Sequence, residues 1–177
     1  ANLAGIYRAL VERASAEGLA SSDLAGTLLF TMCRRFDFGW LVIGYGVGDG
    51  VTAIHRAGEA PLLLIEPDGG EFAGQTRFVT MRSVWENQEE MARRLHFHVV
   101  PRFDAIASMT DGVSDPLFET DRRLRSTEGW ARFFEDLHAE VDLAGDLERQ
   151  AEALLEWLSF FKPGEHDDRT LVLVEPD

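Results

Sequence analysis

Cysteine is almost absent from this 177-residue sequence, which contains only Cys33. An intrachain disulfide is therefore impossible, and a reducing compartment fits best. Long apolar runs are also absent: no stretch approaches the roughly 18 residues that a membrane-spanning helix needs, and the first residues are not typical of a signal peptide. We therefore expect a soluble, cytoplasmic protein without a membrane partner, in which Cys33 is a buried thiol rather than a reactive one.

Basic residues are scarce relative to acidic ones. The chain has 17 lysines and arginines against 31 aspartates and glutamates, which gives a formal net charge of -14. Such a protein repels nucleic acid, whereas its acidic surface suits metal cations or basic partners. The composition, 45% hydrophobic and 27% charged, is that of a globular protein. The length suits one domain, and we expect residues 1–177 to form a single domain.

The order of apolar patterns predicts an α+β fold. Helical spacing marks residues 2–17, and short apolar runs then predict strands. Further helices are indicated by apolar residues at helical spacing from residue 127 and over 146–161, and a last run reads as a strand buried on both faces. The predicted strands are 27–33, 40–45, 51–55, 62–65, 78–81, 96–100, 105–109 and 170–174.

Two acidic loops follow or precede strand-like segments. Asp111, with Gly112 behind it and Asp115 four residues later, ends the run at 105–109, and Asp167 precedes the final strand. Carboxylates on strand ends are suitable ligands for Mg²⁺ and Mn²⁺. Asp49, in a glycine-rich turn between two strands, is a third candidate.

Each acidic feature also has a structural explanation. Asp-Gly pairs are common in turns, and adjacent aspartates such as Asp167 and Asp168 more often cap or solvate a loop. The two loops are 56 residues apart (167 − 111), so spacing alone does not show that they meet.

The joint pattern resembles the PPM (type 2C) metal-dependent protein phosphatases. Residues 110–115, Thr-Asp-Gly-Val-Ser-Asp, resemble the motif in which an apolar strand ends in Asp-Gly with another Asp three residues later. Residues 164–174 resemble the closing Asp-Asn/Asp-x-Ser/Thr motif and its strand. Residues 24–29 and 47–56 resemble the threonine-rich strand entry and the Gly-Asp-Ser turn, and residues 71–80 loosely resemble a bacterial subgroup.

This resemblance implies an α-β-β-α sandwich of two antiparallel sheets flanked by helices, with the metal site at one end. It also implies hydrolysis of phosphoserine and phosphothreonine in proteins by a water that two metal ions activate, without a side-chain nucleophile. The ions would be Mn²⁺ or Mg²⁺, two or three of them. The substrate would be a phosphoprotein, with a bacterial serine/threonine kinase or its targets as counterpart in signalling.

The family's residue roles carry over by position. Asp111 and Asp167 would be direct metal ligands, and Asp49 would help to hold a weaker third ion. Asp115 and Asp168 would orient ligands or waters behind them, with Gly112 allowing the sharp turn. His166, beside Asp167, is a candidate for substrate contact, although an exposed loop residue is the simpler interpretation.

The family's N-terminal metal motif, its phosphate-binding arginine and its general-acid histidine have no counterpart in this sequence. The segment at 68–70, Asp-Gly-Gly, reads instead as a hairpin turn. The resemblance therefore describes the C-terminal two-thirds of a phosphatase domain, and we expect the chain alone to have little or no activity. Two alternatives stay open: a pseudophosphatase or regulatory interaction module that keeps the fold, and an unrelated α+β domain with chance Asp-Gly turns.

The remaining histidines and aromatic residues favour structural roles. His96 and His98 alternate along a predicted strand, and a polar sheet face explains them better than a metal site does. The aromatic side chains of the C-terminal helices are most simply the layer that covers a sheet: Trp130, Phe133, Phe134, Trp157, Phe160 and Phe161.

Overall fold

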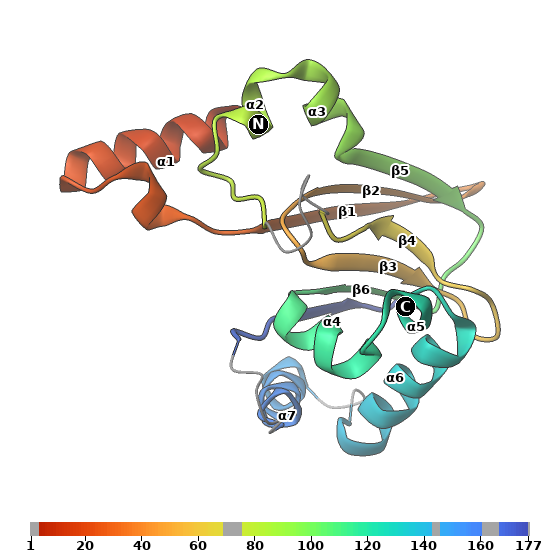
Figure 1. The fold of residues 1–177 in the computed structure, drawn as a ribbon. Helices are drawn as coiled ribbons and strands as arrows, with labels where there is room; N and C mark the ends of the chain where they lie inside the picture. The colour runs from red at the N-terminus through yellow and green to blue at the C-terminus, as the bar shows by residue number, and fades with distance from the viewer. Residues whose placement is uncertain (1–3, 69–75, 143–145, 161–166, 177) are drawn as a thin grey trace. The chain divides into compact units, whose positions relative to one another are not determined.

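The structure is a computed structural model that describes residues 4–68, 76–142, 146–160 and 167–176. The chain packs as two compact units: unit 1 comprises residues 1–52 and 64–101, and unit 2 comprises residues 53–63 and 102–177. Figure 1 follows the elements in chain order from red to blue. The single domain expected from the chain length stays a prediction.

Unit 1 contains most of the N-terminal elements. They are helix α1 (Ala4–Glu17), the 3₁₀ turn η1 (Ser21–Leu24), strands β1 (Leu28–Phe36), β2 (Gly39–Val47) and β5 (Leu95–Val100), and the short helices α2 (Ser83–Glu86) and α3 (Gln88–Arg93). Strands β3 (Val51–His55) and β4 (Leu62–Ile65) continue from one unit into the other along the chain.

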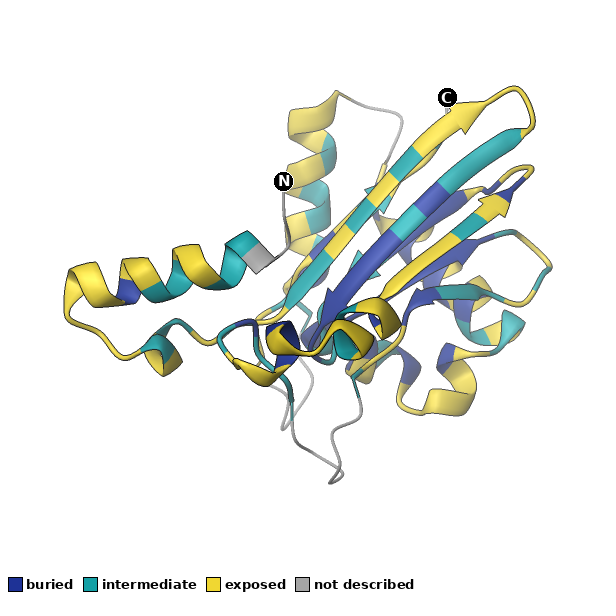
Figure 2. Ribbon diagram, turned by 90° about the horizontal axis from the view of Figure 1, so that it is seen from above, coloured by how far each residue is buried: buried dark blue, intermediate teal, exposed yellow. Residues whose placement is uncertain are grey.

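The first sheet has the order β1-β2-β5, and both pairs are antiparallel. The nearly uninterrupted apolar sequence of β2 suits a central strand. Figure 2 shows this strand largely buried and its two neighbours largely exposed. The register pairs Ile43 with Met32 on one side and with Phe97 on the other. These directly paired residues share a face, and Met32 and Phe97 are exposed on it.

Two glycines of β2 leave room on the opposite face. A Cβ atom at Gly44 would lie 2.7 Å from Leu64 Cγ, and one at Gly46 would lie 2.3 Å from Ile65 Cγ2. Any larger residue would collide with these side chains, so the glycines permit close packing of the end of β4 against β2.

The core of unit 1 lies at one end of β2, where Tyr45 and Val47 pack with Val79, Val84 and Trp85. The predicted strand at 78–81 is wrong: this segment is a turn that leads into α2. Its backbone groups are satisfied individually, because Val79 N donates to Gly26 O (2.9 Å) and Trp85 Nε1 donates to Val79 O (2.7 Å).

The second sheet has the order β4-β3-β6-β7, where β6 is Ala105–Met109 and β7 is Leu171–Val174. β6 and β7 are antiparallel and pair Met109 with Leu171. β7 is at the edge, and only Leu171 of its four residues is buried. The prediction of a final strand is confirmed, but the expected burial on both faces is wrong, because Val172 and Val174, which share one face, are exposed.

The helices of unit 2 are α4 (Asp111–Phe118), α5 (Asp121–Leu124), α6 (Thr127–Glu140) and α7 (Leu147–Leu158). Helix α6 buries Trp130, Phe133, Phe134 and Leu137, which recur at helical spacing. The Phe134 ring stacks on His55 of β3 with centroids 4.2 Å apart. The predicted aromatic layer is therefore confirmed within the described residues; Phe161 lies outside them.

The predicted α+β class, with two antiparallel sheets and flanking helices, is confirmed. Cys33 is half-buried in β1 rather than fully buried, because it lies in an outer strand of its sheet. Among the described helices, none is both long and apolar enough to cross a membrane.

Candidate metal centre

The two acidic loops meet at one end of the β6–β7 strand pair. Because β6 and β7 are antiparallel, the end of β6 and the start of β7 lie side by side. The pairing extends one residue further: Thr110 N donates to Thr170 O (3.1 Å), and Thr170 N donates to Thr110 Oγ1 (3.0 Å). The 56 residues between Asp111 and Asp167 therefore do not separate the two loops in space.

Asp111 is the first residue of helix α4, where the sequence suggested a loop. Thr110 has extended backbone angles and precedes the helix, and Asp111 Oδ1 accepts a hydrogen bond from Gly112 N (2.9 Å). A carboxylate is stabilised at a helix N-terminus by the unpaired amide groups and the helix dipole. Asp115 follows one helical turn later and is exposed. Asp115 was expected near Asp111 if the residues between them form a helical turn, and they do.

Gly112 allows the second loop to lie against this helix. A Cβ atom at Gly112 would be 2.5 Å from Asp168 O and 3.2 Å from Asp167 Cβ. Any other residue would displace the backbone at 167–168. The expected role of Gly112 is thus visible as a contact between the loops rather than as a turn with an unusual dihedral angle.

The loop at 167–170 is held by its own polar groups. Asp167 Oδ1 accepts from Asp168 N (2.8 Å), and Thr110 Oγ1 donates to Asp168 O (3.1 Å). Asp167 and Asp168 are both exposed. The carboxylate of Asp167 therefore stands at the surface of an ordered turn beside the start of α4.

Arg169 ties this loop to two helices, a role that the sequence analysis missed. Its Nε donates to Gly112 O (3.2 Å), and its Nη1 donates to Leu158 O (2.9 Å) and Phe160 O (2.5 Å). Gly112 O is available because Pro116, four residues later, has no N–H to donate to it. In the sequence, only the position of Pro116 indicates that the carbonyl oxygen of Gly112 needs another hydrogen-bond donor.

Asp49 belongs to unit 1, whereas Asp111 and Asp167 belong to unit 2. Asp49 is half-buried directly after β2, and its Oδ2 accepts a hydrogen bond from Thr76 Oγ1 (2.5 Å). Gly48 has a φ of 112°, and a Cβ atom there would lie 2.4 Å from Thr27 Cγ2. Glycine is therefore required at this position for conformation as well as for space.

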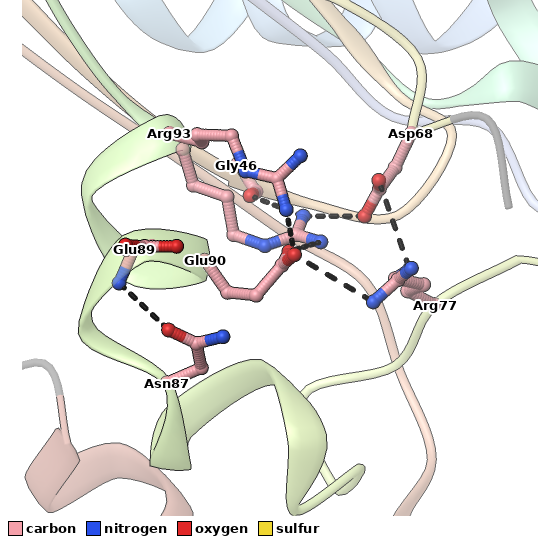
Figure 3. Close-up of polar contacts among 8 residues, drawn as sticks. Gly46, Asp68, Arg77, Asn87, Glu89, Glu90 and Arg93 are labelled. Atoms are coloured by element: carbon pink, nitrogen blue, oxygen red, sulfur yellow. Dashed lines mark hydrogen bonds and ion pairs between the residues drawn. The ribbon is translucent and has the colours of Figure 1, made fainter.

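A cluster of charged residues supports the Asp49 turn. Asp68 N donates to Gly48 O (2.8 Å), and the Asp68 carboxylate pairs with Arg94 and lies 4.0 Å from Arg77. Figure 3 shows Asp68 and Glu90 facing Arg77. Arg94 Nη1 also donates a hydrogen bond to Gly46 O (3.3 Å). Asp68 is the anionic partner of buried Arg94. The hairpin turn expected at 68–70 stays a prediction, because residues 69–70 lie outside the described residues.

The chemistry of the donors fits a hard cation. Mg²⁺ retains several waters and is commonly held by one or two carboxylates, and unit 2 presents Asp111 and Asp167 at one edge. The described residues contain no group of three or more acidic, histidine or cysteine side chains arranged to hold a metal ion. The donors that unit 2 brings together are thus the two aspartates, with water available for the other positions.

A family model described as protein phosphatase 2C matches residues 2–159. The chain belongs to the protein phosphatase 2C family. No curated protein and no solved structure gives a match.

In this phosphatase 2C chain the matched residues include Asp49, Asp111 and Asp115 but end before Asp167. Asp167 is connected to the site by the β6–β7 register and the Thr110–Thr170 hydrogen bonds instead. His166 lies outside the described residues.

The other histidines of this phosphatase 2C chain lie on strands β3 and β5 and on helix α6. His96 and His98 share a face of β5, where they pair with Gly44 and Val42. His55, which the sequence analysis did not select, is buried at the end of β3. Burial lowers the pKa of His55, the charge of Asp104 opposes that shift, and His138 adds to it.

Proposed function

We propose that this chain is the catalytic part of a metal-dependent phosphatase that removes phosphate from phosphoserine and phosphothreonine in proteins. Membership of the protein phosphatase 2C family supports a phosphatase of this kind. The observation that carries the proposal is the meeting of the two acidic loops through Thr110, Gly112 and Asp168.

Asp111 and Asp167 would hold Mn²⁺ or Mg²⁺. A bound ion of this type supplies positive charge for the phosphoryl oxygens and makes a bound water more acidic. The side chains of this chain then have positioning roles. The start of α4 fixes Asp111, and the close contact at Gly112 fixes Asp167 beside it.

Asp115 and Asp168 would orient metal-bound groups from behind the two ligands. Asp115 is one helical turn from Asp111, and Asp168 N donates to Asp167 Oδ1 (2.8 Å). We further propose that Asp49 helps to hold a third, weaker ion; the Thr76 hydrogen bond and the Asp68–Arg94 pair keep its turn ordered. His166 stays a candidate for substrate contact.

The substrate would be a phosphoprotein, and the counterpart a bacterial serine/threonine kinase or its targets. This proposal comes from the resemblance of residues 71–80 to a bacterial subgroup together with the family match. Cytoplasmic signalling is the corresponding setting.

The test is hydrolysis of a phosphothreonine peptide by the natural protein that carries this sequence, with Mn²⁺ and with a chelator. We expect turnover that requires Mn²⁺ and that falls at least about a hundredfold in Asp111→Asn and in Asp167→Asn, since each change removes a ligand charge. Asp37→Asn, an exposed turn residue with the same change in charge, serves as the control. A phosphotyrosine peptide measures the selectivity.

Two outcomes contradict the proposal. Turnover that persists in chelator excludes the metal dependence, and equal turnover of the phosphotyrosine peptide excludes the substrate class. Absence of turnover together with absence of Mn²⁺ binding would favour the alternative, a regulatory interaction module that keeps the fold.

A further inference from the structure

A pocket lies in unit 2, with a volume of about 310 Å³. Its walls come from the end of β3, the turn after it, the start of β6, helix α6 and the residue that follows β7. A volume at the lower end of the range for ligand sites suits a small molecule.

The pocket and the candidate metal centre are at opposite ends of the β6–β7 pair. Ala105 and Glu175 line the pocket, and the register pairs Ile106 with Val174 next to them. Asp111 and Asp167 lie past the other end of the same ladder, where Met109 pairs with Leu171. The pocket is therefore a separate site, and its use does not depend on the proposed phosphatase activity.

One wall of the pocket is aromatic and contains His55 and Phe134. The rings of His55 and Phe134 stack with centroids 4.2 Å apart and an interplanar angle of 25°. Small residues, among them Gly58, Ala105 and Ala131, line the rest of the apolar surface and leave space beside the rings. This shape suits a planar group, which gains both stacking and burial of apolar area.

The charged side chains of the pocket are mainly acidic. Asp104 Oδ2 accepts a hydrogen bond from Ala57 N (2.6 Å), which fixes the carboxylate at the rim. Glu175 is partly exposed, and its Oε1 lies 3.7 Å from Nε2 of His138. Because burial lowers the pKa of His55, its ring does not add a positive charge at neutral pH.

His55 adds an unused hydrogen-bonding group. Its side chain is 7% exposed, and its buried Nδ1 has no hydrogen-bond partner among the residues that the structure describes. Buried polar atoms without a partner are uncommon in native proteins and call for an explanation. His55 therefore adds a hydrogen-bonding group to the pocket lining that the described residues leave unsatisfied.

We infer that this pocket binds a small planar cation, an aromatic amidine or amine, whose ring stacks beside His55 and Phe134 and whose charge pairs with Asp104 and Glu175. The two carboxylates select the sign of the charge, and the aromatic wall selects the ring. An anionic ligand of equal shape meets two carboxylates and binds poorly.

The probe is benzamidine, titrated to 10 mM into the ¹⁵N-labelled 177-residue chain and followed by NMR. We expect saturable binding with a dissociation constant on the order of 1 mM, as suits so few ligand atoms. The shifted amide signals should belong to Gly58, Ala105 and Ala131. Benzoate, of the same shape and opposite charge, should bind at least about tenfold more weakly.

Two variants test the location. Ala131→Trp fills the pocket and should abolish binding, whereas Ala139→Trp, on an exposed position of the same helix outside the lining, should leave it unchanged. Glu175→Gln removes one charge without a change of size and should weaken binding about threefold to tenfold. Circular dichroism checks that each variant is folded.

Three results overturn the inference: no saturable shift by benzamidine up to 10 mM, equal binding of benzoate, or unchanged binding in a folded Glu175→Gln variant. If Ala131→Trp does not fold, Glu175→Gln and the benzoate comparison still decide the question. Phosphatase assays are not needed for any of these measurements, so failure here is distinct from failure of the proposed function.

Discussion

Replacement of Gly112 by alanine tests the contact that brings the two acidic loops together. A Cβ atom at this position would lie 2.5 Å from Asp168 O, and ordinary contact begins at 3.4 Å. The backbone at Asp168 must therefore move by as much as 0.9 Å (3.4 − 2.5). The atom in the way belongs to the backbone, so rotation of a side chain does not relieve the collision.

The displacement has a definite energetic cost. The hydrogen bond from Thr110 Oγ1 to Asp168 O is 3.1 Å long and would be stretched beyond a useful distance. The bond from Arg169 Nε to Gly112 O, at 3.2 Å, spans the same contact. Loss of a neutral and a charged hydrogen bond costs about 2–4 kcal/mol. The better helix propensity of alanine returns at most about 1 kcal/mol.

We therefore expect Gly112→Ala to lower the free energy of unfolding by about 1–3 kcal/mol. For a chain of this size, the melting temperature should fall by roughly 3–10 °C. Urea unfolding and thermal melting measure the effect. Gly5→Ala is the matched control, because Gly5 is also helical and a Cβ atom there meets no described residue within 4 Å.

The result that would refute this reasoning is a Gly112→Ala variant that unfolds like Gly5→Ala and binds Mn²⁺ like the unaltered chain. The loops would then not depend on the close approach at Gly112, and the explanation of how Asp167 is held beside Asp111 would be wrong.

Three further changes test the surroundings of the site and the core of unit 2. Arg169→Met removes three hydrogen bonds to carbonyl groups, and should cost about 2–4 kcal/mol in urea unfolding, whereas Arg132→Met on an exposed helix face should stay within about 0.5 kcal/mol. Trp130→Ala should cost about 3–5 kcal/mol in the same assay, because the side chain is fully buried and its Nε1 donates a 2.7 Å hydrogen bond. Burial lowers the pKa of His55 on folding, so the folded protein binds that proton less tightly than the unfolded chain. The free energy of unfolding should therefore be constant with respect to His55 above about pH 6.5 and fall as the pH decreases from there. His55→Phe should remove this decrease from the free energy of unfolding measured against pH.

Local patterns predicted most of the secondary structure. The alternation and turns between residues 27 and 65 gave four strands, and the spacing of Trp130, Phe133, Phe134 and Leu137 gave helix α6. These strands and this helix depend on residues that are close together in the sequence, so local patterns predict them. The predicted strand at 78–81 failed because Val79 is buried as part of a turn, where it packs with Tyr45, Val47 and Trp85, and not as part of a strand. An apolar run alone does not distinguish these two environments.

The candidate site needed information that spacing does not contain. Asp111 and Asp167 were selected from the sequence, but their proximity depends on the register of β6 and β7. Helix α4 was missed as a helix because Asp-Gly at its start and Pro116 within it both favour a turn. Pro116 is tolerated because Arg169 satisfies the carbonyl group of Gly112 that it leaves without an amide partner. That compensation comes from a residue 57 positions from Gly112, so no local rule predicts it.

Whether Asp111 and Asp167 form a metal centre is tested by Mn²⁺ binding to the 177-residue chain, measured by electron paramagnetic resonance of the free ion. We expect a bound ion whose affinity falls about tenfold or more in Asp111→Asn and equally in Asp167→Asn, with Asp37→Asn unchanged. Equal Mn²⁺ binding by all four proteins would show that the two acidic loops, although they meet in the structure, do not form a metal centre.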